Sequence, residues 1–314
     1  MAGLIHMRPY MCLLRHSSNE LSDYSTHTTK RYDYVMKPLK VSPPKKPKSN
    51  SGAADREGGL RELVMDVLGR EICDSSIPSG TIFATETIED RFQVSRPVAR
   101  EALRGLEALG LLMPRRRVGM TVLPLTSWNV YDLQVIRWRL AGQSRVAQLR
   151  SLTELRSAIE PTAARLAAVR APLGQASELV GIAGHLWRSG KEGNAEEFLK
   201  VDLAFHSLIL EMSGNEMFAQ LHHLVDEVLV GRTQYGLMPR FPAVEALQHH
   251  TDIAVAIQSG NADRAAASML AIMQRTISEM ASIWDKVLDD GTIDDPSNEL
   301  VQTESIKIPN LDHG

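Results

Sequence analysis

The spacing of hydrophobic residues separates an irregular beginning of the chain from a long helical remainder. Residues 1–55 show no sustained period, and regular spacing begins at Gly59. Apolar residues at helical spacing then predict three helices, at 60–75, 85–92 and 93–110. The first carries an apolar stripe of Leu60, Leu63, Val64, Val67, Leu68 and Ile72. Ser95 is the expected N-cap of the third helix, and Gly110 is its expected stop signal. Two short strands around a basic turn follow in 111–124, so the order of elements predicts a winged helix-turn-helix.

From about Ser127 onward the pattern is almost wholly helical. One apolar stripe consists of Leu152, Leu155, Ile159, Ala163 and Leu166. A second consists of Phe198, Val201, Phe205, Leu208 and Met212. Further helices are predicted near 216–236, 243–258 and 261–287, with short breaks at 171–174, 189–194, 213–215, 238–242 and 259–263. Short connections between long helices favour an antiparallel bundle. The predicted fold is therefore mostly α, with an N-terminal winged helix-turn-helix followed by an all-helical antiparallel bundle.

Charge and composition divide the chain further, and we predict four parts at 1–55, 56–126, 127–288 and 289–314. The first part carries nine Lys and Arg against four Asp and Glu, and its Pro- and Lys-rich run indicates a disordered basic arm. It is either a solvated tail, an arm that contacts DNA or the product of a misassigned gene start. The last part carries seven acidic side chains against Lys307 and is expected to form a flexible tail.

The composition excludes several classes of protein. The chain has 314 residues, of which 43% are hydrophobic and 5% aromatic, and this suits helices packed through Ala, Leu and Met. No apolar run reaches the length of about 18 residues that a membrane span needs, so we expect no membrane partner. Cys12 and Cys73 are far apart and form no CxxC pair. Neither a disulfide framework nor a zinc ribbon is therefore expected, and a reducing, cytoplasmic location fits.

Three arginines recur every four residues on the third predicted helix, at Arg96, Arg100 and Arg104. They share one face of the helix, opposite its apolar face. An α-helix fits the major groove of DNA, and Arg is the usual partner of guanine there. Residues near the start of such a helix reach base edges, so we expect Arg96 and Arg100 at bases and Arg104 at phosphate. The alternative is an ordinary solvated face that is locally balanced by Glu101.

The predicted hairpin tip adds three consecutive arginines, Arg115, Arg116 and Arg117. Residues 91–126 as a whole carry seven Arg against two Glu, which favours an anionic partner for this segment. Side chains on a hairpin tip can reach an adjacent groove or phosphates. The alternative is a flexible solvated loop, but a basic helix and a basic hairpin together are more informative than either alone.

Residues 60–122 resemble the DNA-binding domain of the GntR family of bacterial transcription regulators. The resemblance rests on "IPSGT", "TE", "VSRPVAREALRGLEALGLL" and "RRRVGMTV". It implies that Arg96 and Arg100 read bases in double-stranded operator DNA. Thr87 and Ser95 complete the expected set of DNA-contacting residues.

The chain departs from the family pattern at three places. Phe83-Ala84 stands where the family commonly has Leu-Pro, Thr87 where some members carry a base-contacting Arg, and Arg117 where some members have a wing glycine. The operator sequence of a relative therefore does not carry over.

The C-terminal part resembles the all-helical ligand-binding domain, called FCD, of the FadR-type subfamily. The resemblance rests on residues 154–168, 202–215 and 250–269 and covers most of 127–285. Residues 127–138 also resemble the link segment of galactonate-operon repressors within this subfamily. This last similarity implies a sugar acid as the effector.

Three residues form a candidate metal site. Asp202 and His206 lie four residues apart on one helix face, and His250 lies on a later helix. An Asp and neutral imidazoles brought together can bind Zn²⁺ or a similar divalent metal. The FCD resemblance implies an Asp and three His, and the fourth position falls on Ile272. One interpretation is a three-ligand site completed by water or a carboxylate effector, and the other is a polar pocket without metal.

Arg156 and Glu160 are also four residues apart. One interpretation is an ion pair on the helix surface worth about 0.2–0.5 kcal/mol. The FCD resemblance instead points Arg156 into the cavity, where its guanidinium would clamp a carboxylate. The expected effector-binding set is Arg156, Glu160, Asp202, His206 and His250. His222, His223 and His249 lack a matched set of partners and are interpreted as ordinary helix histidines.

These features predict a ligand-responsive transcription regulator. A homodimer would place two winged helices on a palindromic operator, and a small carboxylic acid in the helical domain would change their pose. By resemblance, we expect a repressor that the effector releases. The alternative is a metal-dependent all-α enzyme with an appended nucleic-acid module, in which the Asp and His ligands activate water. The sequence offers no clear general base for such an enzyme.

Overall fold

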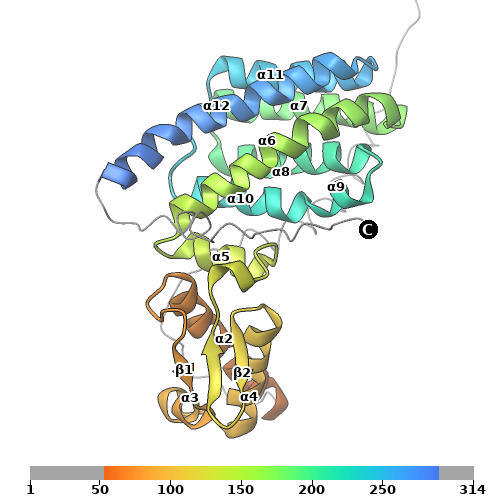
Figure 1. The fold of residues 1–314 in the computed structure, drawn as a ribbon. Helices are drawn as coiled ribbons and strands as arrows, with labels where there is room; N and C mark the ends of the chain where they lie inside the picture. Colours follow the sequence, from red (N-terminus) through yellow and green to blue (C-terminus); the bar gives the residue numbers. More distant parts are fainter. Residues whose placement is uncertain (1–52, 290–314) are drawn as a thin grey trace, which may run out of the picture. The chain divides into compact units, whose positions relative to one another are not determined.

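A computed structural model of the chain describes residues 53–289, and the first part of this range contains three helices and a three-stranded sheet (Figure 1). The elements are α2 (Ala53–Cys73), β1 (Ile82–Phe83), α3 (Thr85–Phe92), α4 (Arg96–Ala108), β2 (Leu112–Arg115) and β3 (Gly119–Val122). The antiparallel sheet has the strand order β1-β3-β2. The predicted winged helix-turn-helix is thus present, with β1 as an additional strand too short to show a period in sequence. The predicted basic arm and acidic tail lie almost entirely outside the described residues.

The three helices and three strands enclose one hydrophobic core. On α4 the buried face consists of Val98, Ala99, Ala102, Leu103 and Leu106. On α2 the predicted stripe is only partly buried. Val64, Leu68 and Ile72 are in the core, whereas Leu60 and Leu63 are exposed.

Two glycines fix the geometry around α4 and the sheet. Gly110 has a φ of 76°, and the N–H groups of Gly110 and Leu111 donate to the carbonyls of Glu107 and Leu106 at 2.9 and 3.0 Å. This is the Schellman pattern that ends a helix, which confirms the predicted stop signal. Gly119 has a φ of 133°, and a Cβ there would collide with the carbonyl oxygen of Phe83. Glycine therefore allows β3 to approach β1.

The helix α5 (Leu133–Ala141), which follows the short 3-10 helix η1 (Leu125–Ser127), contributes side chains to two cores. Trp138 lies in the core of the winged helix, and its indole N–H donates to Asp66 of α2 at 2.8 Å. Leu140 lies in a second core, which is built by the helices that follow. The linking segment is thus itself packed and helical.

Within the described residues, seven further helices form the bundle (Figure 1), namely α6 (Arg145–Arg170), α7 (Leu173–Glu192), α8 (Ala195–Met212), α9 (Glu216–Gln220), α10 (His222–Gln234), α11 (Val244–Gln258) and α12 (Ala262–Asp289). The helix α6 packs against α8, α10, α11 and α12.

Two boundaries in the bundle differ from those predicted from the sequence. The predicted break at 189–194 is shorter because α7 continues to Glu192, and the predicted helix at 216–236 is divided into α9 and α10. Within residues 53–289 no helix is long and apolar enough to cross a membrane.

The buried face of α6 is unexpectedly polar. Leu155 and Ile159 of the predicted apolar stripe are only half-buried, whereas Thr153, Arg156 and Glu160 are buried. Polar side chains in the centre of a bundle need partners, because burial without hydrogen bonds is costly. Arg156 and Glu160 pair with each other and with His206 of α8, and these contacts define the candidate site.

Candidate functional site

The exposed face of α4 carries the three arginines predicted to meet DNA. Arg96, Arg100 and Arg104 are exposed, opposite the buried face of the helix. Ser95 occupies the N-cap, as predicted, but its side chain makes no capping hydrogen bond, and it is exposed like Thr87 of α3. These positions suit DNA contact, and the roles of the residues stay predictions.

Neighbouring carboxylates hold two of these arginines. Arg96 Nη2 lies 3.1 Å from Glu86 Oε1, and Arg104 Nη1 lies 2.8 Å from Glu101 Oε1. Glu101 thus balances Arg104, and the structure shows no ion pair for Arg100 among residues 53–289. The "TE" motif is the sequence signal that contains Glu86, although its spacing from Arg96 does not identify the contact.

The tip of the β2–β3 hairpin presents Arg115, Arg116 and Arg117, all of them exposed. Val118 N–H donates to the Arg115 carbonyl at 3.0 Å and closes the turn. Arg117 has a φ of 62°, in the left-handed region that costs a side chain with a Cβ about 1–2 kcal/mol. Arg117 therefore adds a positive charge at a position of the turn where the backbone conformation favours glycine.

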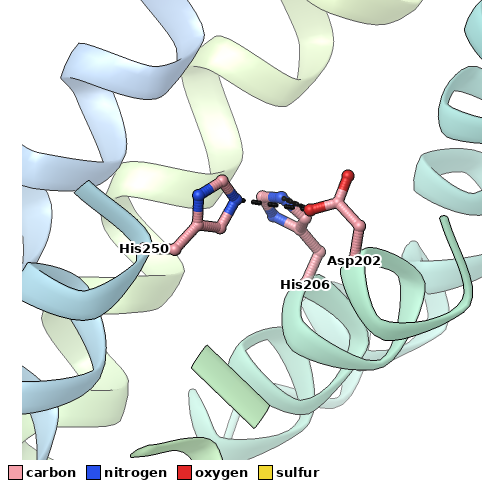
Figure 2. Close-up of side chains that lie close together, drawn as sticks. All are labelled: Asp202, His206 and His250. Carbon is pink, nitrogen blue, oxygen red and sulfur yellow. Dashed lines mark ion pairs between the residues drawn. The ribbon is translucent and has the colours of Figure 1, made fainter. Parts of the chain in front are cut away.

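Inside the bundle, Asp202 and His206 of α8 converge with His250 of α11 (Figure 2). His206 Nε2 and His250 Nε2 lie 3.5 and 3.3 Å from the same atom, Asp202 Oδ1. The three residues are 4%, 2% and 5% exposed. Among the described residues, neither Asp202 Oδ1 nor His250 Nε2 has a hydrogen-bond partner. The predicted candidates are therefore brought together, with buried polar atoms aimed at one point.

The opposite ring nitrogens fix the orientation of both imidazoles. His206 Nδ1 lies 2.5 Å from Glu160 Oε2, and His250 Nδ1 lies 2.7 Å from the carbonyl oxygen of Ala246. The hydrogen bond from His250 Nδ1–H and the ion pair at His206 Nδ1 leave each Nε2 directed at Asp202, which is how metal-binding histidines are usually held. One carboxylate and two imidazoles fit a divalent ion such as Zn²⁺. The residues present thus suit a metal.

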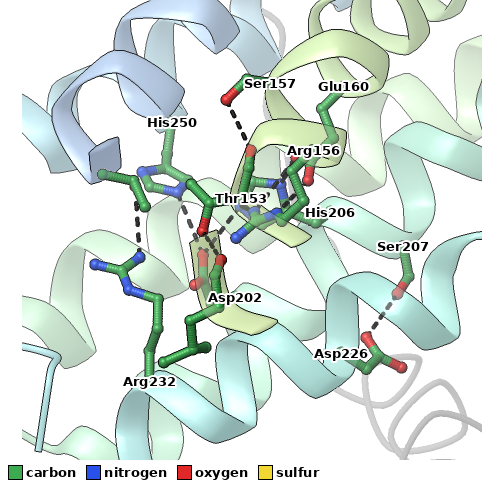
Figure 3. Close-up of polar contacts among 12 residues, drawn as sticks. Thr153, Arg156, Ser157, Glu160, Asp202, His206, Ser207, Asp226, Arg232 and His250 are labelled. Atoms are coloured by element: carbon green, nitrogen blue, oxygen red, sulfur yellow. Dashed lines mark hydrogen bonds and ion pairs between the residues drawn. The ribbon is translucent and has the colours of Figure 1, made fainter. Parts of the chain in front are cut away.

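Arg156 and Glu160 form an ion pair in the protein interior (Figure 3). Arg156 Nε lies 2.5 Å from Glu160 Oε1, and the two side chains are 3% and 1% exposed. The interpretation as a surface ion pair is therefore wrong. Burial alone would raise the pKa of Glu160, but Arg156 and His206 lower it to about 2. Ionised Glu160 thus balances Arg156 and forms an ion pair with His206.

A cavity of about 50 Å³ adjoins this cluster. Arg156 and the predicted metal ligands line one side of it, and α12 lines another. Ile272 of α12 lies in the wall, so an apolar side chain occupies the position where the FCD resemblance places a fourth ligand. The wall of the cavity therefore contains cations, possible metal ligands and an apolar side chain at the expected fourth ligand position.

Arg232 of α10 is a cavity residue that the sequence pattern does not reveal. It is 4% exposed, its Nη1 lies 3.4 Å from Thr276 Oγ1 and its Nη2 lies 3.2 Å from Glu279 Oε2. Its Nε has no hydrogen-bond partner within the described part of the chain. A guanidinium has five N–H donors, so this buried cation has unused capacity at the cavity wall (Figure 3).

Metal affinity at this site should rise with pH. Burial alone would lower the pKa of His206, but Glu160 and Asp202 raise it to about 9. A metal must displace the proton from Nε2, so below that pKa each pH unit should change the affinity about tenfold. Competition with a chelating dye should show a Zn²⁺ dissociation constant about tenfold lower at pH 8 than at pH 7. His206→Ala is the control that should lose tight binding, and a pH-independent affinity in the unsubstituted chain would contradict the assignment.

Two family models match the chain. The model described as "Bacterial regulatory proteins, gntR family" matches residues 60–122, and the FCD domain model matches residues 151–275. The first covers the winged helix with its exposed arginines. The second begins within α6 and extends to the middle of α12, and it includes the buried cluster.

Curated relatives agree with these matches. The chain is 30% identical over 170 residues to the "Uncharacterized HTH-type transcriptional regulator YieP" of Escherichia coli K12, covering 53% of this chain and 74% of that protein. It is 27% identical over 226 residues to the "Galactonate operon transcriptional repressor" of the same organism, covering 70% and 97%. It is 28% identical over 204 residues to the "HTH-type transcriptional regulator LutR" of Bacillus subtilis 168, covering 62% and 88%. These relatives are transcription regulators, which decides against the metal-dependent enzyme.

Proposed function

Because the chain belongs to the GntR family of bacterial regulatory proteins and carries an FCD domain, we propose that it is a repressor of transcription released by a small carboxylic acid. In this proposal α4 and the wing bind operator DNA as parts of a homodimer. The buried cluster holds a divalent metal, and the effector binds beside it.

The unused donor of Arg232 is the observation that carries the effector proposal. A buried guanidinium with an unpaired Nε in a cavity wall is costly unless an anion or other acceptor reaches it. Arg156 and Arg275 also line the cavity. A carboxylate suits such a site because guanidinium and carboxylate form strong paired hydrogen bonds.

We propose that a divalent metal binds at the part of the cavity wall formed by the Asp and His side chains. Asp202, His206 and His250 would hold it, and Glu160 would keep His206 in the required orientation. The ion would supply positive charge and at least one free coordination position, because Ile272 offers no ligand atom. A carboxylate oxygen of the effector is the natural occupant of that position.

Two observations bear on the identity of the effector. The galactonate operon repressor supports both repression and a sugar acid, since its name joins the two. The cavity of about 50 Å³ is small, given that a cavity of about 150 Å³ holds benzene. Met238, Pro239 and Pro242, between α10 and α11, line it. A six-carbon acid would therefore displace this loop, which gives the effector a direct mechanical effect on α10.

The contacts of α10 support coupling between effector and DNA. Arg232 of this helix faces the cavity, and Glu227 of the same helix lies 2.6 Å from Arg137 of α5. Trp138, the next residue of α5, donates to Asp66 of α2. Effector and operator affinities must then change each other by the same factor.

A carboxylate screen by thermal shift tests the proposal. Sugar acids, hydroxy acids and simple carboxylates would be compared on metal-loaded protein, and a ligand at about 100 times its dissociation constant should stabilise by about 2.7 kcal/mol. Arg232→Gln should weaken the responding acid about tenfold or more, because a charged hydrogen bond contributes about 1.5–3 kcal/mol. The same acid should release the protein from its operator.

Arg165→Gln is the matched control. Arg165 lies on α6 in a half-exposed ion pair with Asp263 and does not line the cavity. Its replacement should leave the shift unchanged. Equal loss in both variants, or a full response in Arg232→Gln, would exclude Arg232 as an effector contact.

A further inference from the structure

A second cluster of possible metal ligands lies at the start of α10. His222 and His223 are the first two residues of this helix, and Asp226 follows one turn later. Their ligand atoms all lie within 4.8 Å of one another. The two imidazole rings are in contact, with centroids 3.7 Å apart. Asp226 is therefore a nearby carboxylate that the interpretation of these histidines from sequence leaves out, although it lies only one helical turn away.

Asp226 is a buried carboxylate with little compensation. It is 7% exposed, and its Oδ1 accepts a long hydrogen bond of 3.5 Å from Ser207 of α8, apart from the Asp202 cluster (Figure 3). No Lys or Arg within residues 53–289 forms an ion pair with it. A buried carboxylate without a cation is costly, and a bound metal ion is one way to compensate it.

The orientation of His222 resembles that of the histidines in the cavity. Its Nδ1 lies 2.6 Å from the carbonyl oxygen of Ala219, so Nδ1–H donates and Nε2 keeps its lone pair. The same contact fixes His250 through Ala246. Backbone anchoring of this kind is common among metal-binding histidines. His222 is half-buried and His223 exposed, so ions can reach this cluster from solvent.

We propose that His222, His223 and Asp226 form a second binding site, for a Zn²⁺-like transition ion, separate from the cavity site. Two imidazoles and one carboxylate favour Zn²⁺, Co²⁺ or Ni²⁺ over Mg²⁺ or Ca²⁺, which prefer oxygen ligands. Three protein ligands leave positions for water, so the ion is exchangeable. The positive N-terminal end of α10 opposes a cation, so this site binds more weakly than the cavity site.

The position of this second site connects it to the effector cavity and to α5. Asp226 is adjacent to Glu227, which holds Arg137 of α5. Arg232, further along the same helix, lines the cavity. An ion at the start of α10 would therefore order the helix that touches both the effector cavity and α5.

Metal stoichiometry of the full chain tests the proposal. Titration with Co²⁺, followed by its visible absorption, and equilibrium dialysis with Zn²⁺ should each give two sites per chain of unequal affinity. His223→Ala should remove the weaker site and leave the tighter one. Asp226→Asn, checked for folding by circular dichroism, should do the same, and His249→Ala should retain both as a matched histidine control.

A His206→Ala background separates this proposal from the one for the cavity. Removal of the cavity site should leave one weaker ion per chain, and adding His223→Ala should abolish it. A chain that binds no ion once His206 is replaced would overturn the second site, as would a weaker site that survives His223→Ala and Asp226→Asn. A chain with a single site that His206→Ala leaves intact and His223→Ala removes would count against the cavity metal and not against this proposal.

Discussion

Replacing Arg156 by Met should lower the free energy of unfolding by about 3 kcal/mol. The substitution removes a cation and leaves Glu160, 1% exposed, as a buried carboxylate. His206 still forms an ion pair with Glu160 and compensates part of its charge, so we expect the low end of the range for broken buried pairs. Chemical denaturation at pH 7 measures the change directly. The cavity should also lose its affinity for carboxylates.

Helix α6 itself offers the control for this substitution. Arg150 and Glu154 form the same i, i+4 pair on α6, but their side chains are 51% and 59% exposed. Arg150→Met should therefore cost less than about 0.5 kcal/mol. The double variant Arg156→Met, Glu160→Gln should recover most of the loss, because Gln keeps an acceptor for His206 without a charge. Similar small costs for Arg156→Met and Arg150→Met would show that the interior tolerates an unpaired Glu160.

The sequence predicts α4 well because its signals are local. Ser95 precedes the helix, Gly110 follows it, and the apolar face between them has the helical period. β1 is missed because it consists of two residues that pair with β3, which lies more than 30 residues away in sequence. Its formation depends on the approach that Gly119 allows, and no local pattern reports such a contact.

The candidate site is predictable only in part, for a related reason. Asp202 and His206 share a helix face, so their spacing alone places them together, whereas His250 joins them only through the FCD resemblance. Arg156 has the spacing of a surface ion pair, and from the sequence only the FCD resemblance indicates that α6 turns this polar face inward, as the packing shows. Arg232 and Glu86 have no sequence signal for their contacts, because both depend on the tertiary arrangement of separate helices.

Arg100→Ala should weaken binding to the selected operator by about 1–3 kcal/mol, or roughly 5- to 150-fold. Arg100 is exposed on α4 and shows no ion pair among residues 53–289, so nothing in that range competes for its guanidinium. A bidentate contact to guanine would be lost, and base preference should relax at one position of each half-site. In-vitro selection would define the operator, and fluorescence anisotropy on that site and on scrambled DNA would give the affinities.

Comparing substitutions on α4 with one on the wing tests whether Arg100 contacts bases or only the DNA backbone. Arg116→Ala should weaken binding to operator and scrambled DNA alike and reduce the salt slope by about one, because a phosphate contact releases a counterion on any sequence. Arg96 should behave like Arg100, but Glu86 holds it at 3.1 Å. Glu86→Ala should therefore change the base preference at the position that Arg96 reads. If Arg100→Ala weakens binding to both DNAs equally, Arg100 contacts the DNA backbone. The assignment of Arg96 and Arg100 to bases would then be wrong.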